Sequence, residues 1–250
     1  MNDFESLILE LQREVDSEKI CKFVDIIDEL SSVAERYGNT VEEFICLAKT
    51  ATKTRFCIQS KYIHRGCCCP SPVIDLLVGN TKRGKLTDKL PKTKKEYFKY
   101  YYDDTGFVFF AEKYNPGLSV ESPVEVEIIV RDNDVEFGIT FDSINPTSIN
   151  YLTKAHYEGQ FIKSYSELVY SEYIQKAMMD LHYEEYMYTE NQLTKANMYF
   201  GIIPSFNIYD LNECFFRYDD NGKIYEYDVL RKSKLSTYSV PKAKYSQRLL

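Results

Sequence analysis

The chain has 250 residues, of which 38 are acidic and 31 basic, with seven Cys, three His, 22 Tyr and no Trp. This length is enough for one large domain or two small ones, each with its own hydrophobic core. A charged content of 28% excludes an integral membrane protein, and an aromatic content of 15% excludes a disordered chain. No apolar stretch approaches the roughly 20 residues that a membrane-spanning helix needs.

The cysteines and the first residues predict where the protein works. An odd number of Cys, three of them adjacent, argues for reduced thiols and against a disulfide framework. The acidic sequence MNDFESLILELQREVDSEK has neither the basic start nor the apolar core of a secretory signal. We therefore expect a cytoplasmic protein.

The first part of the chain has the residue spacing of amphipathic helices. Apolar side chains recur every three or four positions over residues 4–11 and again over residues 23–34. Gly38 is expected to end the second helix, because glycine accepts the left-handed conformation that a helix end commonly requires. We predict a helical segment over residues 1–80.

A third helix is predicted after that glycine, and it suggests an alternative function. Thr40 and Glu43 form a capping-box pattern in front of the apolar residues 44–48. The two helices and their short connection, residues 22–50, resemble a helix-turn-helix, so a DNA-binding regulator is the alternative hypothesis. Glu42 and Glu43 argue against it, because they begin the helix that would have to meet phosphates.

A basic connector over residues 81–98 separates the helical segment from a region of predicted β-hairpins over residues 99–231. Each hairpin consists of two aromatic or β-branched runs on either side of a turn rich in Asp, Asn or Gly. The predicted hairpins span residues 99–114, 124–141, 151–165, 183–200 and 214–231. Residues 164–181 fit a helix as well as a strand. Residues 232–250 form a basic tail.

Consecutive hairpins imply an antiparallel sheet with one covered face. The predicted fold class is therefore α+β, with N-terminal helices followed by a twisted antiparallel sheet of consecutive β-hairpins. Eighteen of the 22 Tyr lie between positions 97 and 227, where a ring with a polar end suits half-buried strand positions.

The hairpin region is strongly acidic. Residues 101–230 contain 23 acids and eight bases, a net charge of −15, whereas residues 231–250 contain six bases and no acid. Such a field repels nucleic acid and speeds association with a basic protein. The candidate partner-binding residues are the acids of the predicted turns and one acidic pair between them, namely Asp103, Asp104, Asp132, Asp134, Glu184, Glu185, Asp219 and Asp220.

Residues that could support catalysis or metal binding are present without a diagnostic spacing. Adjacent cysteines such as Cys67, Cys68 and Cys69 cannot easily face one tetrahedral zinc ion, even with Cys57 and His64 nearby. The Asp-rich turns do not continue into the twelve-residue loop of a calcium site. No P-loop, dinucleotide-binding or nucleophile-elbow motif occurs. We therefore expect no metal, no cofactor and no enzymatic activity, and an enzyme whose site is assembled from distant residues is the third hypothesis.

Three segments of the hairpin region carry a resemblance to a known class of proteins. They are YYYDDTGFVFFAEKYNPG at residues 100–117, INYLTKAHYEGQFIKSY at 149–165 and CFFRYDDNGKIYEYDVLR at 214–231. These segments resemble the tyrosine- and acid-rich immunity proteins of bacterial polymorphic-toxin and contact-dependent inhibition systems. The resemblance implies a cytoplasmic, non-catalytic inhibitor that binds a cognate toxin domain, with no nucleic-acid or membrane partner. A nuclease toxin would need a basic active site, which an acidic inhibitor could occupy in place of phosphate.

Overall fold

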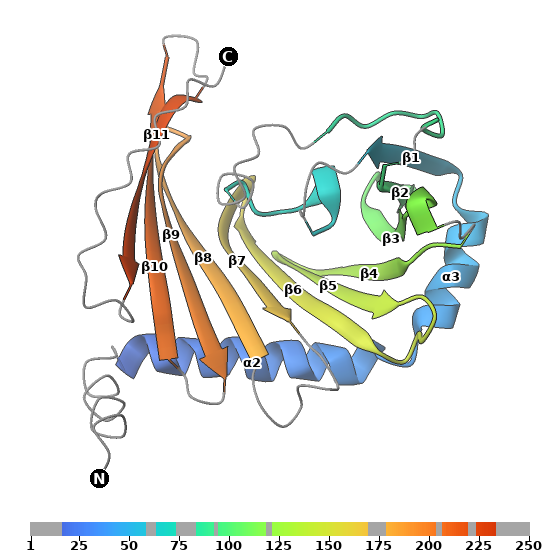
Figure 1. Cartoon of the computed structure of the whole chain (residues 1–250), viewed down its shortest axis with the longest axis horizontal. Coiled ribbons are helices and arrows are strands. Elements are labelled where there is room, and N and C mark those ends of the chain that lie inside the picture. The colour runs from blue at the N-terminus through green and yellow to red at the C-terminus, as the bar shows by residue number, and fades with distance from the viewer. Residues whose placement is uncertain are drawn as a thin grey trace. The chain divides into compact units, whose positions relative to one another are not determined.

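The computed structural model describes residues 17–58, 64–73, 84–92, 95–118, 122–169, 179–203, 207–219 and 224–233. The chain forms two compact units (Figure 1). Unit 1 comprises Met1–Ser32 and Ser166–Leu250, and unit 2 comprises Val33–Tyr165. Each unit is described by itself below.

Two helices precede the strands. Helix α2 (Ser17–Tyr37) confirms the helix predicted over residues 23–34, and helix α3 (Val41–Thr50) confirms the one predicted over residues 44–48. The helix predicted over residues 4–11 lies outside the described residues. Among the residues that the structure describes, neither helix combines the length and the apolar character needed to cross a membrane.

Two contacts in the connection between the helices differ from the predictions made for Gly38 and Thr40. Gly38 is not left-handed. Its N–H donates to the Ala34 carbonyl over 2.8 Å, and a Cβ at this position would lie 2.6 Å from the same oxygen. Close approach of the backbone is therefore what requires glycine here. The Thr40 hydroxyl donates to the Tyr37 carbonyl over 2.9 Å, so the predicted capping of α3 by this side chain is wrong.

Unit 2 contains an antiparallel sheet in which strand order follows chain order. Short 3-10 helices, η1 (Gly66–Cys68) and η2 (Pro116–Leu118), interrupt its loops. The strands are β1 (Lys53–Ile58), β2 (Tyr97–Tyr102), β3 (Val108–Tyr114), β4 (Glu125–Asp132), β5 (Val135–Asp142), β6 (Ile149–Glu158) and the first residues of β7 (Phe161–Val169).

Unit 1 contains the remaining strands, which also form antiparallel hairpins in chain order. They are the end of β7, then β8 (Met179–Thr189), β9 (Gln192–Ile203), β10 (Asn207–Tyr218) and β11 (Ile224–Ser233). All five predicted hairpins are thus present, and the α+β fold class is confirmed. Residues 164–169 and 179–181, at the two ends of the ambiguous segment, are strand, and residues 170–178 between them lie outside the described part of the chain.

Two of the expected segment boundaries differ from the structure. Strand β1 lies within residues 1–80, which we expected to be helical, and it pairs with β2 across a long connection. The predicted connector, residues 81–98, is not only a solvated link. Its Thr87 forms a two-way backbone bridge with Phe56 of β1, with both N–H to carbonyl distances at 2.8 Å.

One part of the core of unit 2 lies on the face of its sheet that is here called the first face. Register places Phe110 beside Ile128, Ile128 beside Ile139 and Ile139 beside Leu152, and all four side chains are fully buried. Such cross-strand rows are the unit of sheet stabilisation. The helix end at Gly38 approaches the same face through Ile149.

In unit 1, helix α2 packs on β8 and β9 through an aromatic cluster. The Phe23 ring lies edge-on to Tyr183 and Tyr199, at centroid distances of 6.0 and 6.5 Å. Lys22 on the same helix bonds Glu185 over 2.5 Å. These contacts show that Tyr183 and Glu185, odd-numbered residues of β8, point to the side of the sheet that α2 covers.

Replacing Phe23 with leucine is expected to lower the free energy of unfolding of unit 1 by about 1 kcal/mol, because leucine keeps apolar burial but loses both edge-to-face ring contacts. Urea unfolding followed by the near-ultraviolet circular dichroism of the tyrosines measures this change. The matched control is Met187→Leu on β8, a side chain 40% exposed, whose effect should stay below about 0.5 kcal/mol. Equal effects of the two variants would contradict this packing.

Candidate functional site

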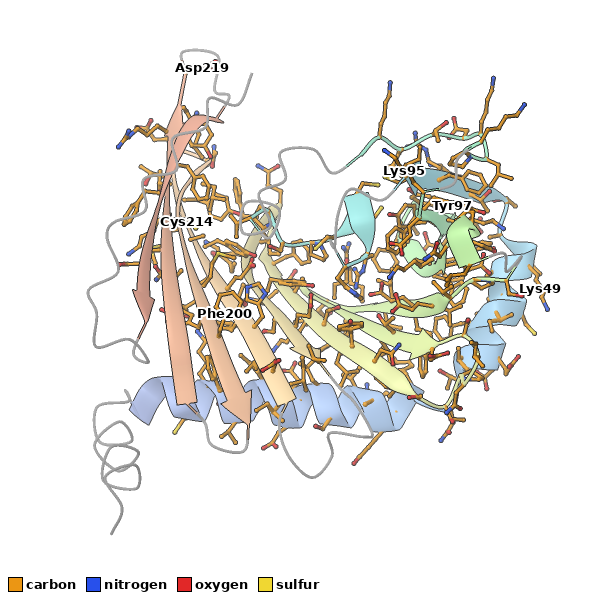
Figure 2. All side chains as sticks on the ribbon, viewed as in Figure 1. Lys49, Lys95, Tyr97, Phe200, Cys214 and Asp219 are labelled. Atoms are coloured by element: carbon orange, nitrogen blue, oxygen red, sulfur yellow. The ribbon has the colours of Figure 1, made fainter. Side chains whose placement is uncertain are left out.

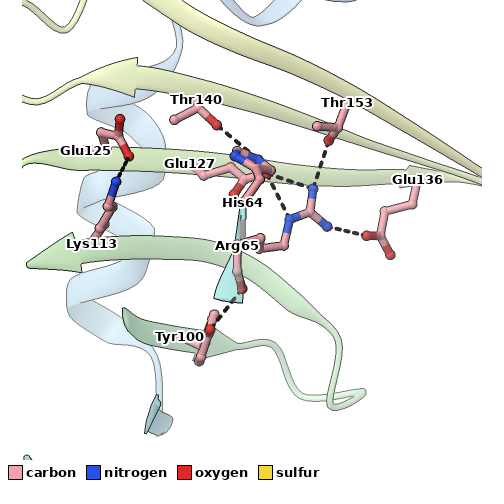
Figure 3. Close-up of polar contacts among 9 residues, drawn as sticks. All are labelled: His64, Arg65, Tyr100, Lys113, Glu125, Glu127, Glu136, Thr140 and Thr153. Atoms are coloured by element: carbon pink, nitrogen blue, oxygen red, sulfur yellow. Dashed lines mark hydrogen bonds and ion pairs between the residues drawn. The ribbon is translucent and has the colours of Figure 1, made fainter. Parts of the chain in front are cut away.

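The second face of the unit 2 sheet is covered by residues 64–73, and Arg65 anchors this segment. Arg65 is 2% exposed and has a positive φ of 57°. Its guanidinium donates from Nε to Glu127 over 2.8 Å, from Nη1 to Glu136 over 2.5 Å and from Nη2 to Thr153 over 3.1 Å (Figure 3). One buried cation is thus held by strands β4, β5 and β6.

Neighbouring side chains complete this network, and its positively charged groups affect the pKa of Glu127. His64 lies 3.2 Å from Glu127, and the Tyr100 hydroxyl donates to the Arg65 carbonyl over 2.9 Å. Burial opposes the charge of Glu127, but Arg65 and His64 outweigh it and hold its pKa at about 2. Because this pKa is depressed, the stabilisation is present above pH 4.5 and is lost as the pH falls toward 2.

Gly138 of β5 makes room for the guanidinium. A Cβ at this position would overlap Arg65 Nη2, the Glu127 carboxylate and the Thr153 hydroxyl. Glycine inside a strand often marks such a close approach. Any larger residue at position 138 therefore displaces the arginine.

Beside the network lies an open pocket of about 460 Å³. Arg65 and Glu136 reach it from the network, and Phe107, Arg131 and Tyr157 form another side of it. The Arg131 guanidinium lies over the rings of Phe107 and Tyr157, 4.7 and 5.4 Å from their centroids, and bonds Glu136 over 2.9 Å. Burial raises the pKa of Tyr157 to about 12, so its hydroxyl stays protonated. The pocket therefore offers aromatic surface together with paired charges.

The turns next to this pocket lie side by side at one end of the sheet. The β2–β3, β4–β5 and β6–β7 turns share an end because the strands alternate in direction. The guanidinium of Arg131, next to the second turn, lies over the ring of Phe107, next to the first turn, so these two turns adjoin. The Tyr157 N–H donates to the Asp134 carbonyl over 2.8 Å, which joins the second turn to the third.

These turns bring together four of the predicted partner-binding residues. We call Asp103, Asp104, Asp132, Asp134 and Glu158, all of which are exposed, the turn surface. Asp103 has a second role, because its carboxylate accepts hydrogen bonds from the Thr105 hydroxyl, over 2.7 Å, and from the Thr105 and Phe107 N–H groups, over 2.9 Å each. These donors, the Thr105 hydroxyl foremost, lower the pKa of Asp103 and keep it charged.

Three of the other predicted residues, Glu184, Glu185 and Asp219, belong to unit 1 and not to these turns. Glu184 is fully buried, and its carboxylate lies 2.9 Å from His182 and accepts a hydrogen bond from the Tyr186 hydroxyl, so its prediction as an exposed contact is wrong. Glu185 points to the opposite face, where it pairs with Lys22. Asp219 directly follows β10 and is half-buried (Figure 2), and Asp220 lies outside the described residues.

The pair formed by His182 and Glu184 does not have the surroundings of a catalytic site. His182 stacks on Phe200 at 4.6 Å, and its side chain is 11% exposed. Cys214 on β10 (Figure 2) is fully buried, and burial together with Glu184 raises its pKa to about 12. A nucleophilic cysteine needs the opposite shift. The arrangement instead holds His182 and Glu184 2.9 Å apart inside unit 1.

Unit 1 is expected to lose stability as the pH rises above 6.5. Burial opposes the charge of His182, but Glu184 and Glu167 outweigh it and raise its pKa above 6.5. The folded state then binds the proton more tightly than the unfolded state, so this stabilisation is complete below pH 6.5 and is lost as the pH rises through the folded pKa. Urea midpoints between about pH 5.5 and 8.5 measure the trend, which His182→Asn should flatten. An unchanged trend in that variant would assign it to another group.

Metal ligands were a further possibility for the cysteines. All seven cysteines are thiols, and Cys57, Cys67 and Cys68 lie together on the second face of the sheet. Within the described ranges, no three His, Cys, Asp or Glu side chains are arranged to hold a metal ion.

Comparison with known proteins adds no assignment. A scan of the sequence against protein-family models finds no match, and a search of curated proteins finds none either.

Proposed function

We propose that the chain is a non-catalytic inhibitor that binds a basic partner protein through the turn surface of unit 2. The partner is a cognate toxin domain with a cationic, nuclease-like active site, neutralised in the cytoplasm of the producing cell. The observation that carries this proposal is the alignment of three turns, which gathers five exposed carboxylates at one end of the sheet.

The charge balance at this end supports a cationic partner. Of the neighbouring bases, Arg131 is paired with Glu136 and Lys163 with Glu158, over 2.9 and 2.8 Å. Asp104 and Asp134 are not drawn into these pairs. A concentrated negative field raises the local concentration of a basic protein and accelerates its association.

The pocket beside the turn surface supports a protein partner. Phe107 and Tyr157 present ring surface there, and aromatic side chains are among the residues that most often carry interface energy. Charged groups around an aromatic centre are the usual anatomy of a specific interface. The resemblance of the hairpin segments to toxin-associated immunity proteins supports the same function class.

Capture of the partner from a lysate of the source organism tests the proposal. The baits are the full chain, the variant D104N/D132N/D134N and the control D25N/D28N/E35Q, which removes three exposed acids of α2. We expect the full chain and the control to capture one basic protein in equimolar amount, and the turn variant to capture clearly less of it after the same short incubation at low salt. Asparagine keeps the shape of each aspartate, and Asp103 stays in place to hold its turn.

The captured protein is then assayed for toxic activity with and without the chain. Loss of its activity on binding supports neutralisation. Equal capture by the turn variant and the full chain would exclude the turn surface, and capture of duplex DNA in place of a protein would favour the helix-turn-helix alternative.

A further inference from the structure

Three cysteines from two separate elements converge on the second face of unit 2. Cys57 of β1 is fully buried, and Cys67 and Cys68 of η1 are half-buried against the same hydrophobic cluster, which contains Phe98 and Tyr100. Cys57, Cys67 and Cys68 pack in this one cluster, and the Cys67 sulfur lies 3.6 Å from the Tyr100 hydroxyl oxygen. A pattern of adjacent cysteines in the sequence thus becomes a cluster of three thiols.

The elements that carry these thiols are fixed on both sides. Segment 64–73 is held by the buried Arg65 network, and the Tyr100 hydroxyl donates to the Arg65 carbonyl next to Cys67. On the other side, β1 is paired with β2 and bridged to Thr87, and Gly84 lies directly against the Cys57 sulfur. The two segments that carry these three cysteines are therefore held next to each other by the fold.

A thiol cluster of this kind concentrates negative charge on its central sulfur. The neighbouring Cys57 and Cys68 thiols lower the pKa of Cys67, and their contacts with Cys67 raise the pKa of the two outer cysteines. The thiolate is the nucleophilic form of cysteine. Cys67 is thus the cysteine expected to attack a disulfide. The neighbouring Cys57 and Cys68 are thiols that can then form a disulfide bond with it.

We propose that Cys67 is an oxidant-sensitive residue that forms a reversible disulfide with Cys57 when it meets a small-molecule disulfide. The Cys67 thiolate attacks one sulfur of that disulfide, the Cys67–sulfur bond forms, and the other half leaves as a thiolate that takes a proton from water. Cys57 then gives up its proton and attacks Cys67, which releases the second half as a thiol. Overall, two protein thiols are oxidised and one small disulfide is reduced to two thiols.

Geometry favours Cys57 over Cys68 as the resolving residue. Disulfides join residues whose Cα atoms are roughly 4.4–6.8 Å apart, whereas consecutive Cα atoms across a trans peptide are about 3.8 Å apart. Cys67 and Cys68 are consecutive, so a bond between them would distort the backbone of η1. Cys57 meets Cys67 from β1 without that constraint. The crosslink would join β1 to segment 64–73, which lines the pocket. This inference does not depend on the proposed toxin partner.

Oxidation of the intact chain at graded ratios of oxidised to reduced glutathione tests this site. Remaining thiols are alkylated, and linked peptides are mapped by mass spectrometry. We expect a Cys57–Cys67 peptide in the native chain, a mixed disulfide on Cys67 in C57S, and an unchanged Cys57–Cys67 bond in C68S. No such peptide, or a bond between Cys67 and Cys68 in its place, would overturn the proposal.

A labelling rate supplies a second measurement that needs no variant. The pH at which iodoacetamide labelling of native Cys67 reaches half of its maximal rate should lie below that of Cys46, which is exposed on α3. A midpoint for Cys67 at or above that of Cys46 would show that its thiolate is not favoured and would also overturn the proposal.

Discussion

The variant D104N/D132N/D134N is expected to associate with the basic partner about tenfold more slowly than the native chain at low salt, while its dissociation rate changes little. The three carboxylates are exposed at the end of the sheet. They remain in contact with water and attract a basic partner before the two proteins touch. The difference should shrink at high salt, because the screening length falls from about 10 Å at 0.1 M to about 3 Å at 1 M. Stopped-flow association at several ionic strengths measures it.

The control for this experiment removes the same number of charges elsewhere. D25N/D28N/E35Q neutralises exposed acids on α2 and changes the net charge of the chain equally. We expect it to slow association by less than about twofold, because a local field and not total charge guides the encounter. If the two triple variants behave alike, net charge alone drives association and the turn surface has no special role.

Replacing Arg65 with methionine is expected to destabilise unit 2 by about 3–5 kcal/mol, because it takes the buried guanidinium away from the Glu127 and Glu136 carboxylates and leaves only His64 and the exposed Arg131 beside them. The side chains of these two glutamates are only 5% and 8% exposed, so water cannot replace the guanidinium. Amide hydrogen exchange of peptides from β4 and β5 measures the loss where it arises. Substitution of Gly138 by alanine should increase the amide hydrogen exchange of the same peptides, because it displaces the guanidinium.

Removing the arginine and both glutamate charges together distinguishes two contributions to stability. One is the cost of a buried charge without its partner, and the other is the net stabilisation by the whole ion network. We expect R65M/E127Q/E136Q to be more stable than R65M alone, because replacing a whole buried ion network is often close to neutral, whereas removing one partner is not. A triple variant as unstable as R65M would mean that packing of the arginine side chain, and not its charge, holds segment 64–73.

The hairpins were predictable because their signals are local. Turns such as Asp103–Gly106 and Asp132–Asp134 contain the residues that tight turns require, and the flanking runs are aromatic or β-branched. Strand β1 was missed for the opposite reason. It pairs with β2 across residues 59–96, and nothing near Lys53–Ile58 in the sequence marks that pairing.

The acidic pair in β8 shows where simple strand geometry was overlooked. Neighbouring residues in a strand point to opposite faces, so Glu184 and Glu185 cannot both belong to one exposed surface. Glu185 faces α2 and Lys22, and Glu184 is buried beside His182. Alternation alone would have excluded at least one of them.

The Arg65 network could be suspected from the sequence but not assembled from it. Glu127 and Glu136 each lie between apolar residues of a strand, and a charge that is buried there needs a partner. Gly138 inside a strand marks a close approach. The partner itself comes from a loop more than 60 positions away, in a left-handed conformation that nothing in the sequence indicates.

The most direct test of neutralisation is a titration of the captured partner's activity with the full chain. We predict that activity falls linearly to background at one chain per partner, and that D104N/D132N/D134N requires a clear excess to reach the same inhibition. Activity that persists at a large excess of the native chain, under conditions where the complex is formed, would contradict inhibition through the turn surface.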